Sequence, residues 1–194
     1  LGDVYKRQAL WMAKLSVPAL KITRHNGTDF PGTLALKLCP DFLKYVGRPK
    51  TIIAVTGTNG KTTVSNLLAD TLEKAGHRVL INRAGSNVAS GIATALLKGC
   101  NLAGRVKDYD MAVLEVDERS SVRVYPYITP DYIAVTNLFR DSIMRNAHAD
   151  FIAGIISRSI PAASKLVLNA DDLISCGLAP VSYTHLTLPT IRLV

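Results

Sequence analysis

The sequence lacks the features that mark disulfide-rich, metal-binding and membrane-spanning proteins. Its 194 residues include three cysteines, Cys39, Cys100 and Cys176, which lie far apart and form no CxxC pair. This spacing argues against a zinc site or a disulfide framework, and it favours a reduced, cytoplasmic setting. The longest stretch without a charged side chain, residues 173–191, is interrupted by glycine and proline. It is therefore not typical of a membrane span.

Aromatic residues are also scarce, and the excess of positive charge is confined to one part of the chain. Aromatics make up 6% of the residues, and the formal net charge is +8. Residues 9–50 hold seven basic and two acidic side chains, whereas residues 51–180 are almost balanced in charge. A basic stripe with interleaved aromatics would indicate nucleic-acid binding. This sequence has no such stripe, so we expect no nucleic-acid partner.

The two ends of the chain are unlike the part between them. Residues 1–8 (LGDVYKRQ) and 181–194 (VSYTHLTLPTIRLV) are typical of translated adapter read-through at the ends of fragmentary gene assemblies. The alternative for the second segment is a genuine β-branched strand followed by a turn. We expect non-native scars at 1–8 and 181–194, a basic N-terminal segment at 9–50, and a truncated central domain at 51–180.

Short apolar runs alternate with helical patterns along the central part of the chain. The predicted strands are Thr51–Thr56, Arg78–Ile81, Met111–Val116, Tyr132–Thr136 and Lys165–Leu168. Apolar residues at helical spacing predict three helices. The first begins at Lys61 and is closed by Gly76, the second spans Val88–Lys98, and the third contains Ile155. This alternation predicts an α/β fold, a parallel sheet with helices on both faces. Ligands of such sheets bind at the carboxyl ends of the strands.

A glycine-rich loop joins the first predicted strand to the first predicted helix. Residues 56–63 read TGTNGKTT. Glycines let backbone N–H groups approach phosphate oxygens, and the helix N-terminus adds a favourable dipole. In a phosphate-binding loop Lys61 reaches the β- and γ-phosphates and the Thr62 hydroxyl holds Mg²⁺. The spacing departs from the general GxxxxGK[ST] pattern, because Val55 stands where the first glycine is expected. The alternative is a turn that binds nothing.

That departure is informative, because TGTNGKTT resembles the ATP loop of the Mur ligase superfamily. Members of this superfamily form amide bonds through acyl phosphates. Further motifs resembling the family follow the later strands, with LEVDE at 114–118, NLFRD from Asn137 and NADD at 169–172. FPG at 30–32 and the NLFRD segment resemble one branch, the MurT-like subunits of lipid II isoglutaminyl synthases. The resemblance covers about residues 25–176 and implies that 51–180 is an incomplete Mur ligase central ATP-binding domain.

The resemblance also implies which residues form the site. Those assigned to ATP are Gly57, Thr58, Asn59, Gly60, Lys61, Thr62, Thr63 and Asn137. Thr62 and Glu115 are implied to hold Mg²⁺, a cation that favours one or two carboxylates together with phosphate oxygens and water. Arg83 and Asp141 are candidates for contact with the substrate. The catalytic residues are not assigned, because in the family the main catalytic groups belong to a C-terminal domain.

Each assignment has a purely structural alternative. Glu115, or Glu118 in the same motif, would otherwise cap the following helix. Asn137 and Asp141 would otherwise make loop hydrogen bonds, and Arg83 would be a solvated surface residue. His148 and the three cysteines are interpreted as structural residues only.

The MurT-like branch implies a specific reaction. ATP would phosphorylate the α-carboxyl of D-glutamate in the lipid II stem peptide. Ammonia released from glutamine by a separate glutaminase subunit of the GatD type would then attack the acyl phosphate. This fragment alone is expected to be inactive. The lipid-linked substrate and the basic segment at 9–50 further suggest a cytoplasmic protein that makes peripheral contact with the inner face of the membrane. The alternative is that the basic segment is an ordinary solvated surface.

Two other functions remain open at this point. One is a Mur-type or folylpolyglutamate-type ligase that adds an amino acid, and the other is a nucleotide-binding module without ligase chemistry. The amino-acid-adding Mur ligases carry Asp-His after the fourth strand, whereas this chain has Asp141 followed by Ser142. They also use a carbamylated lysine nearby, and this chain has no lysine between Lys107 and Lys165. Both departures favour the amidating branch.

Overall fold

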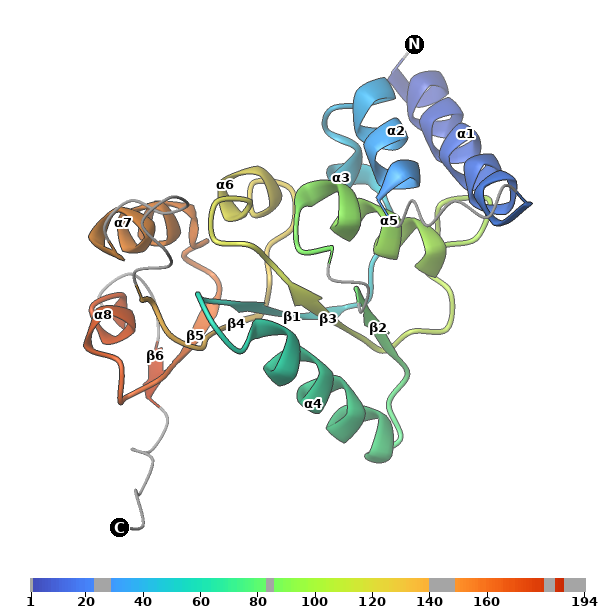
Figure 1. Cartoon of the computed structure of the whole chain (residues 1–194). Helices are drawn as coiled ribbons and strands as arrows, with labels where there is room; N and C mark the ends of the chain where they lie inside the picture. Colours follow the sequence, from blue (N-terminus) through green and yellow to red (C-terminus); the bar gives the residue numbers. More distant parts are fainter. Residues whose placement is uncertain (1, 23–28, 83–85, 140–148, 180–183, 187–194) are drawn as a thin grey trace.

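A six-stranded parallel sheet lies at the centre of this computed structural model, which describes residues 2–22, 29–82, 86–139, 149–179 and 184–186. The strands are β1 (Thr51–Thr56), β2 (Val79–Ile81), β3 (Met111–Glu115), β4 (Tyr132–Val135), β5 (Lys165–Leu168) and β6 (Thr184–Leu186). Their order is β2-β3-β1-β4-β5-β6 (Figure 1). The central strand β1 pairs with β3 on one side and with β4 on the other.

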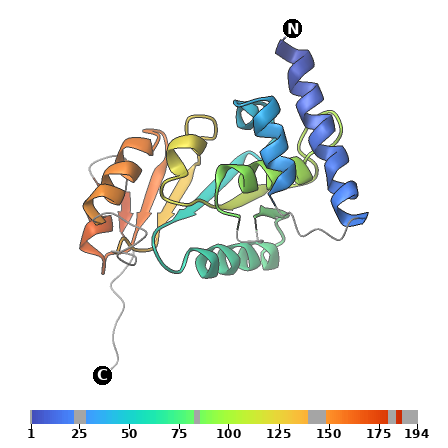
Figure 2. The same cartoon turned by 45° about the horizontal axis from the view of Figure 1, so that its top comes forward.

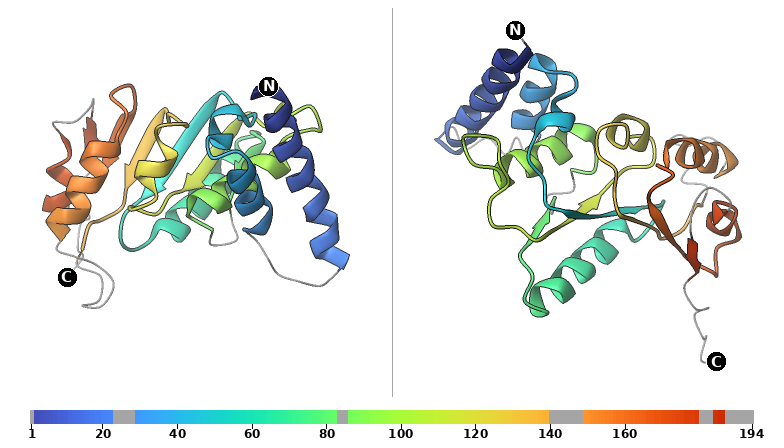
Figure 3. Two further views of the ribbon diagram at one scale, coloured as in Figure 1. Left: turned by 90° about the horizontal axis from the view of Figure 1, so that it is seen from above. Right: turned by 180° about the vertical axis from the view of Figure 1, so that it is seen from behind.

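Helices cover both faces of the sheet, as the sequence predicts. They are α1 (Gly2–Ile22), α2 (Phe30–Leu38), α3 (Phe42–Tyr45), α4 (Lys61–Lys74), α5 (Ala89–Gly99), α6 (Ser121–Val124), α7 (Ala149–Ser159) and α8 (Leu173–Cys176). Helix α4 lies against one face, while α5, α6 and α7 lie on the opposite side (Figure 3). Helices α1 and α2 lie side by side, outside α5 (Figure 2). The α/β fold class is confirmed.

The predicted elements match the observed ones closely. Strands β1 and β5 have the predicted bounds, and β2 begins one residue later than expected, at Val79. Helix α4 ends at Lys74, and Gly76 follows with φ +93°. The His77 N–H donates to the Leu72 carbonyl at 3.1 Å, which closes the helix with the turn expected of a glycine just past the end. Strand β6 is an addition to the five predicted strands.

Three helices occupy the N-terminal segment, for which the sequence predicted a basic character and no helix. Ala9, Leu10 and Ala13 of α1 are buried in the same hydrophobic core as the sheet. The Gly32 N–H of α2 donates to Thr94 Oγ1 of α5 at 2.8 Å. A Cβ at Gly32 would lie 1.8 Å from the Ser90 carbonyl oxygen, so glycine is what lets these helices approach so closely.

The ends of the chain are partly built into the fold. Residues 2–8 form the first turns of α1, and residues 184–186 pair with β5 as strand β6. The interpretation of 1–8 and 181–194 as non-native scars stays a prediction, because secondary structure carries no information about origin. Among the described residues, no helix has both the length and the apolar character needed to cross a bilayer.

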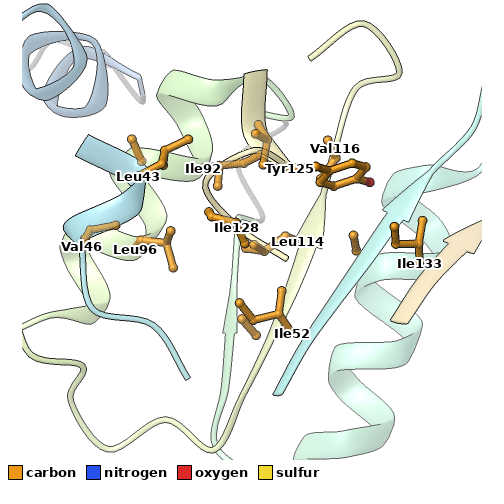
Figure 4. Packing of buried hydrophobic residues seen from close by; sticks show 14 of the residues in the cluster. Leu43, Val46, Ile52, Ile92, Leu96, Leu114, Val116, Tyr125, Ile128 and Ile133 are labelled. Atoms are coloured by element: carbon orange, nitrogen blue, oxygen red, sulfur yellow. The ribbon is translucent and has the colours of Figure 1, made fainter. Parts of the chain in front are cut away.

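The main core lies between the sheet and the helices on the α5 side. Ile52 and Leu114 of the central strands face Ile92 and Leu96 of α5 (Figure 4). A second, smaller cluster between α4 and the sheet includes Val55, Ala69, Val79 and Val113. The strands are therefore buried on both faces, which explains why they read as continuous apolar runs rather than alternating ones.

The buried cysteines behave as packing residues. Burial and a hydrogen bond to Asp41 raise the pKa of the Cys39 thiol to about 11. Burial also raises the pKa of Cys100 above its usual value. Because the thiolate is the reactive form, these two thiols are inert at neutral pH.

Candidate nucleotide site

The glycine-rich loop lies between the carboxyl end of β1 and the first residue of α4. Gly57 has φ +125° and Gly60 has φ +80°, conformations that strongly favour glycine. A Cβ at Gly57 would lie 2.3 Å from Thr136 Oγ1, whereas one at Gly60 would meet nothing within 4 Å. As at the start of any α-helix, the first N–H groups of α4 have no acceptor within the helix and are available to an anion. This arrangement fits a polyphosphate.

Lys61, the first residue of α4, turns its side chain back over the loop. Its Nζ atom donates to the carbonyl oxygens of Gly57 and Thr58 and forms an ion pair with Glu118 Oε1 at 3.1 Å. The Lys61 and Glu118 side chains are only 13% and 10% exposed. Burial raises the pKa of the Glu118 carboxyl, and the adjacent lysine partly opposes this. The Glu118 side chain binds Lys61 and does not cap the following helix. The N-cap residue of α6 is Ser120.

Thr62 and Glu115 lie next to each other at the mouth of the loop. The Thr62 hydroxyl donates to Glu115 Oε2 at 2.9 Å, across a sequence separation of 53 residues. A hydroxyl and a carboxylate are oxygen ligands of the kind that Mg²⁺ prefers. No cluster of three or more His, Cys, Asp or Glu side chains suited to a metal occurs in the described parts of the chain. The pair thus fits a cation that keeps most of its ligands from phosphate and water.

Two asparagines that the sequence analysis did not assign hold Glu115 in place. Asn82 is buried and brackets the Glu115 backbone, accepting from its N–H and donating to its carbonyl oxygen, both at 2.9 Å. Asn87 Nδ2 donates to Glu115 Oε1 at 3.2 Å. The available signal was the position of Asn82 directly after β2, where polar residues meet the ends of neighbouring strands.

Asn137, two residues after the end of β4, contacts Thr58 and Asn59 of the glycine-rich loop. Its carbonyl oxygen accepts from the Thr58 N–H at 2.7 Å, and its Oδ1 accepts from the Asn59 N–H at 3.0 Å. Its Nδ2 also donates to the Asn59 carbonyl oxygen at 3.1 Å. Asn137 therefore shapes the loop through hydrogen bonds, and its assignment to ATP stays a prediction.

The NADD motif after β5 makes hydrogen bonds to the segment that contains Asn137. The Asp172 carboxylate is buried and accepts from the Leu138 N–H at 2.7 Å. It also accepts from the N–H groups of Ile174 and Ser175, each at 3.3 Å. Asn169 Nδ2 donates to the Thr136 carbonyl oxygen at 3.0 Å. The loops after β4 and β5 are thus tied into one frame around the glycine-rich loop.

The remaining predicted residues are placed as follows. Thr58 is half-buried, whereas Asn59 and Thr63 are exposed at the tip of the loop and the start of α4. Arg83, Asp141 and His148 lie outside the described residues. The structure therefore brings together the predicted loop, Thr62, Glu115 and Asn137, and it leaves the two candidate substrate residues as predictions.

A comparison with protein families identifies this arrangement. The Mur ligase middle domain matches residues 55–176, from β1 through α8. The chain belongs to the Mur ligase family. The matched range contains Lys61, Thr62, Glu115, Asn137 and Asp172, so the whole frame described above lies inside the middle domain.

Individual relatives agree with this assignment. The subunit MurT of the glutamine-hydrolyzing lipid II isoglutaminyl synthase of Staphylococcus aureus strain COL is 37% identical over 166 residues. That alignment covers 84% of this chain and 37% of the relative, so the chain spans little more than a third of that protein's length. The resemblance to the MurT branch, inferred from the NLFRD segment, is confirmed.

Solved structures of Mur ligases share the fold. MurF from Acinetobacter baumannii aligns with a TM-score of 0.61 at 19% identity, over 79% of this chain and 34% of that one. The MurF ligase of Thermotoga maritima in complex with ADP aligns with a TM-score of 0.55 at 18% identity, over 83% of this chain and 36% of that one. At these identities the likeness establishes the fold of this Mur ligase middle domain.

We expect Asp172→Asn to weaken the binding of ADP by the full-length protein about fivefold to tenfold. Asparagine removes the charge and one acceptor oxygen, so a buried backbone N–H loses its partner at a cost of about 1–3 kcal/mol. The segment that contains Asn137 would then be held less firmly against the glycine-rich loop. Isothermal titration calorimetry measures the affinity. The matched control is Asp171→Asn, an exposed neighbour; equal affinity in the two variants would show that Asp172 does not position the site.

Proposed function

We propose that this chain is the nucleotide-binding part of an ATP-dependent amidating ligase. The observation that carries the proposal is the contact between Thr62 and Glu115 beside Lys61, in a family of amide-forming ligases. The likeness to MurT subunits supports an α-carboxyl of D-glutamate in the lipid II stem peptide as the acceptor. The carboxylate takes the γ-phosphoryl group of ATP and ADP leaves. Ammonia then attacks the acyl phosphate carbonyl, and phosphate leaves.

The residues of this chain contribute binding and positioning to that reaction. The N–H groups at the start of α4 and the Lys61 ammonium bind the phosphates, and glycine at positions 57 and 60 lets the backbone approach them. Thr62 and Glu115 would hold Mg²⁺, which neutralises phosphate charge. Asn82 and Asn87 orient Glu115 for this role. Catalysis of this kind rests on alignment and on charge stabilisation.

The ammonia source is the second part of the proposal. The name of the S. aureus relative describes a glutamine-hydrolyzing synthase and calls MurT a subunit of it. In the described chain, the buried thiols of Cys39 and Cys100 have raised pKa values and are unsuited to act as a glutaminase nucleophile. On the strength of that name, we assign glutamine hydrolysis to a separate glutaminase subunit of the GatD type.

A coupled assay on the full-length protein tests the proposed function. ATP hydrolysis is expected to require a lipid II analogue and ammonia, and glutamine is expected to replace ammonia only when the glutaminase subunit is present. The chain of 194 residues alone is expected to show no amidation. Turnover with an amino acid in place of ammonia would identify an amino-acid-adding ligase instead. Nucleotide binding without any acceptor-dependent hydrolysis would identify a binding module.

A weak contact of the basic N-terminal segment with an anionic membrane is the third part of the proposal. Lys14 and Arg48 already have structural roles: Lys14 Nζ donates to the carbonyls of Leu97 and Cys100 at the end of α5, and Arg48 donates to Leu43 and Tyr127. Lys37, Lys44 and Lys50 are exposed. Among the described basic side chains of the segment, these three are therefore the ones that would meet a membrane surface, at roughly 1 kcal/mol each.

Changing the three exposed lysines to glutamine is expected to abolish salt-sensitive binding to vesicles. Co-sedimentation of the full-length protein with phosphatidylserine-containing vesicles, at low and high salt, measures the effect, because such attraction is screened within a Debye length. Lys14→Gln is not a suitable variant, since it removes the cap of α5. Equal sedimentation of wild type and variant would exclude membrane contact through these three lysines.

A further inference from the structure

The Lys61 ammonium is shared between the glycine-rich loop and one carboxylate. Its Nζ atom contacts the carbonyl oxygens of Gly57 and Thr58 and lies 3.1 Å from Glu118 Oε1. Glu118 comes from the turn after β3, and Lys61 opens α4, so the pair joins two elements that are 57 residues apart. The lysine that the phosphates need is thus already neutralised by a fixed negative charge.

Glu118 is poorly placed to find another partner. Glu118 as a whole residue is only 8% exposed. Among the described residues, Lys61 is the one cation with which Glu118 forms an ion pair. The neighbouring Tyr125 is buried, and its hydroxyl has no hydrogen-bond partner in that part of the structure. The pKa of Tyr125 is raised by burial and, to a smaller degree, by the negative charge of Glu118. Glu118 therefore depends on Lys61 for its charge balance.

A bound polyphosphate would compete for the same ammonium. A phosphate oxygen in contact with Lys61 Nζ would share that ammonium with the Glu118 carboxylate, so the two negative groups would lie close together. Charges of the same sign at such short range in a partly buried site repel strongly. We propose that Glu118 competes with the β- and γ-phosphates for Lys61 and thereby lowers the affinity of the site for nucleoside di- and triphosphates. This inference rests on the proposed function, because it requires a nucleotide in the loop.

Competition predicts a gain in affinity when the charge is removed. In the full-length protein, Glu118→Gln is expected to bind ADP roughly tenfold more tightly than the wild type. The titration is done with EDTA present, so that the effect of a metal is removed. AMP, which has no β-phosphate, is expected to bind both forms equally. Glu73→Gln removes the same charge from an exposed position on α4 and is expected to leave ADP affinity unchanged.

Two further measurements separate competition from other roles of Glu118. Glu118→Asp keeps the charge and is expected to bind ADP with an affinity close to that of the wild type, while thermal unfolding verifies that both variants are folded. If Glu118 instead held Lys61 in a productive position or acted as a metal ligand, Glu118→Gln would weaken ADP binding, with EDTA or with Mg²⁺ respectively. Either result overturns the inference while the proposed function stands. A wild-type protein that binds no ADP overturns both.

Discussion

Replacing Lys61 with alanine is expected to lower ATP-dependent turnover of the full-length protein by about a hundredfold or more, which is the scale of removing one positioned charge from a reacting phosphoryl or acyl group. Lys61 stands at the start of α4 with its ammonium over the glycine-rich loop, where the β- and γ-phosphates would lie. A coupled ATPase assay with a lipid II analogue measures the loss. Lys74→Ala, an exposed lysine at the other end of α4, serves as the matched control.

The same substitution has a second effect that the sequence did not predict. A lysine at a loop tip carries little packing, so from sequence alone the expected change in the free energy of unfolding is below about 1 kcal/mol. In the structure, Lys61→Ala leaves the buried Glu118 carboxylate without its partner, at a cost of about 1–3 kcal/mol. Adding Glu118→Gln to Lys61→Ala should restore stability but not turnover. Wild-type turnover in the single variant would contradict the assignment of the loop.

The sequence predicted the parts of the site that depend on local pattern. The strand–loop–helix unit around Lys61 was predictable because the β-branched run, the glycines and the helical spacing all lie within one short window. The resemblance implied that Thr62 and Glu115 share one cation; the observed sheet explains why they meet, because the carboxyl ends of the paired strands β1 and β3 share one edge.

The contacts that hold the site in shape were not predictable in the same way. Asn82 brackets the Glu115 backbone across 33 residues, and Asp172 reaches the Leu138 N–H across 34 residues. Neither pairing leaves a periodicity or a spacing in the sequence. They arise because a buried backbone group that leaves a strand end needs a hydrogen-bond partner, and the partner comes from whichever loop lies nearest in space.

The N-terminal helices were missed for a different physical reason. Counting charge over residues 9–50 hides the apolar face of α1, where Ala9, Leu10 and Ala13 are buried. The contact of α2 with α5 depends on Gly32, and a glycine in a helix is a poor sign of helix by propensity alone. Tertiary packing, with Lys14 donating to the carbonyls at the end of α5, supplies the stability that local pattern does not indicate.

Replacing Glu115 with glutamine is expected to reduce Mg²⁺-dependent ATP hydrolysis by about a hundredfold in the full-length protein, because the charged side chain proposed to hold the cation would become a neutral one. Glutamine has nearly the same shape, and its Oε1 atom can still accept from the Thr62 hydroxyl, so the fold is expected to be kept. The measurement is a titration of the ATPase rate against MgCl₂. The midpoint is expected to move to higher magnesium concentration as the maximal rate falls.

The glutamine variant also separates a metal role from a cap role for Glu115. If Glu115 holds Mg²⁺, then ADP binding measured in EDTA is expected to stay the same or strengthen in Glu115→Gln, because a negative charge beside the phosphates has been removed. If Glu115 only stabilised its turn, Glu115→Gln would lower the unfolding temperature and leave the magnesium titration unchanged. Glu115→Asp keeps the charge but shortens the side chain by one methylene. The carboxylate then moves away from Thr62 and Asn87, and an intermediate magnesium midpoint is expected because Asn82 still fixes the Glu115 backbone.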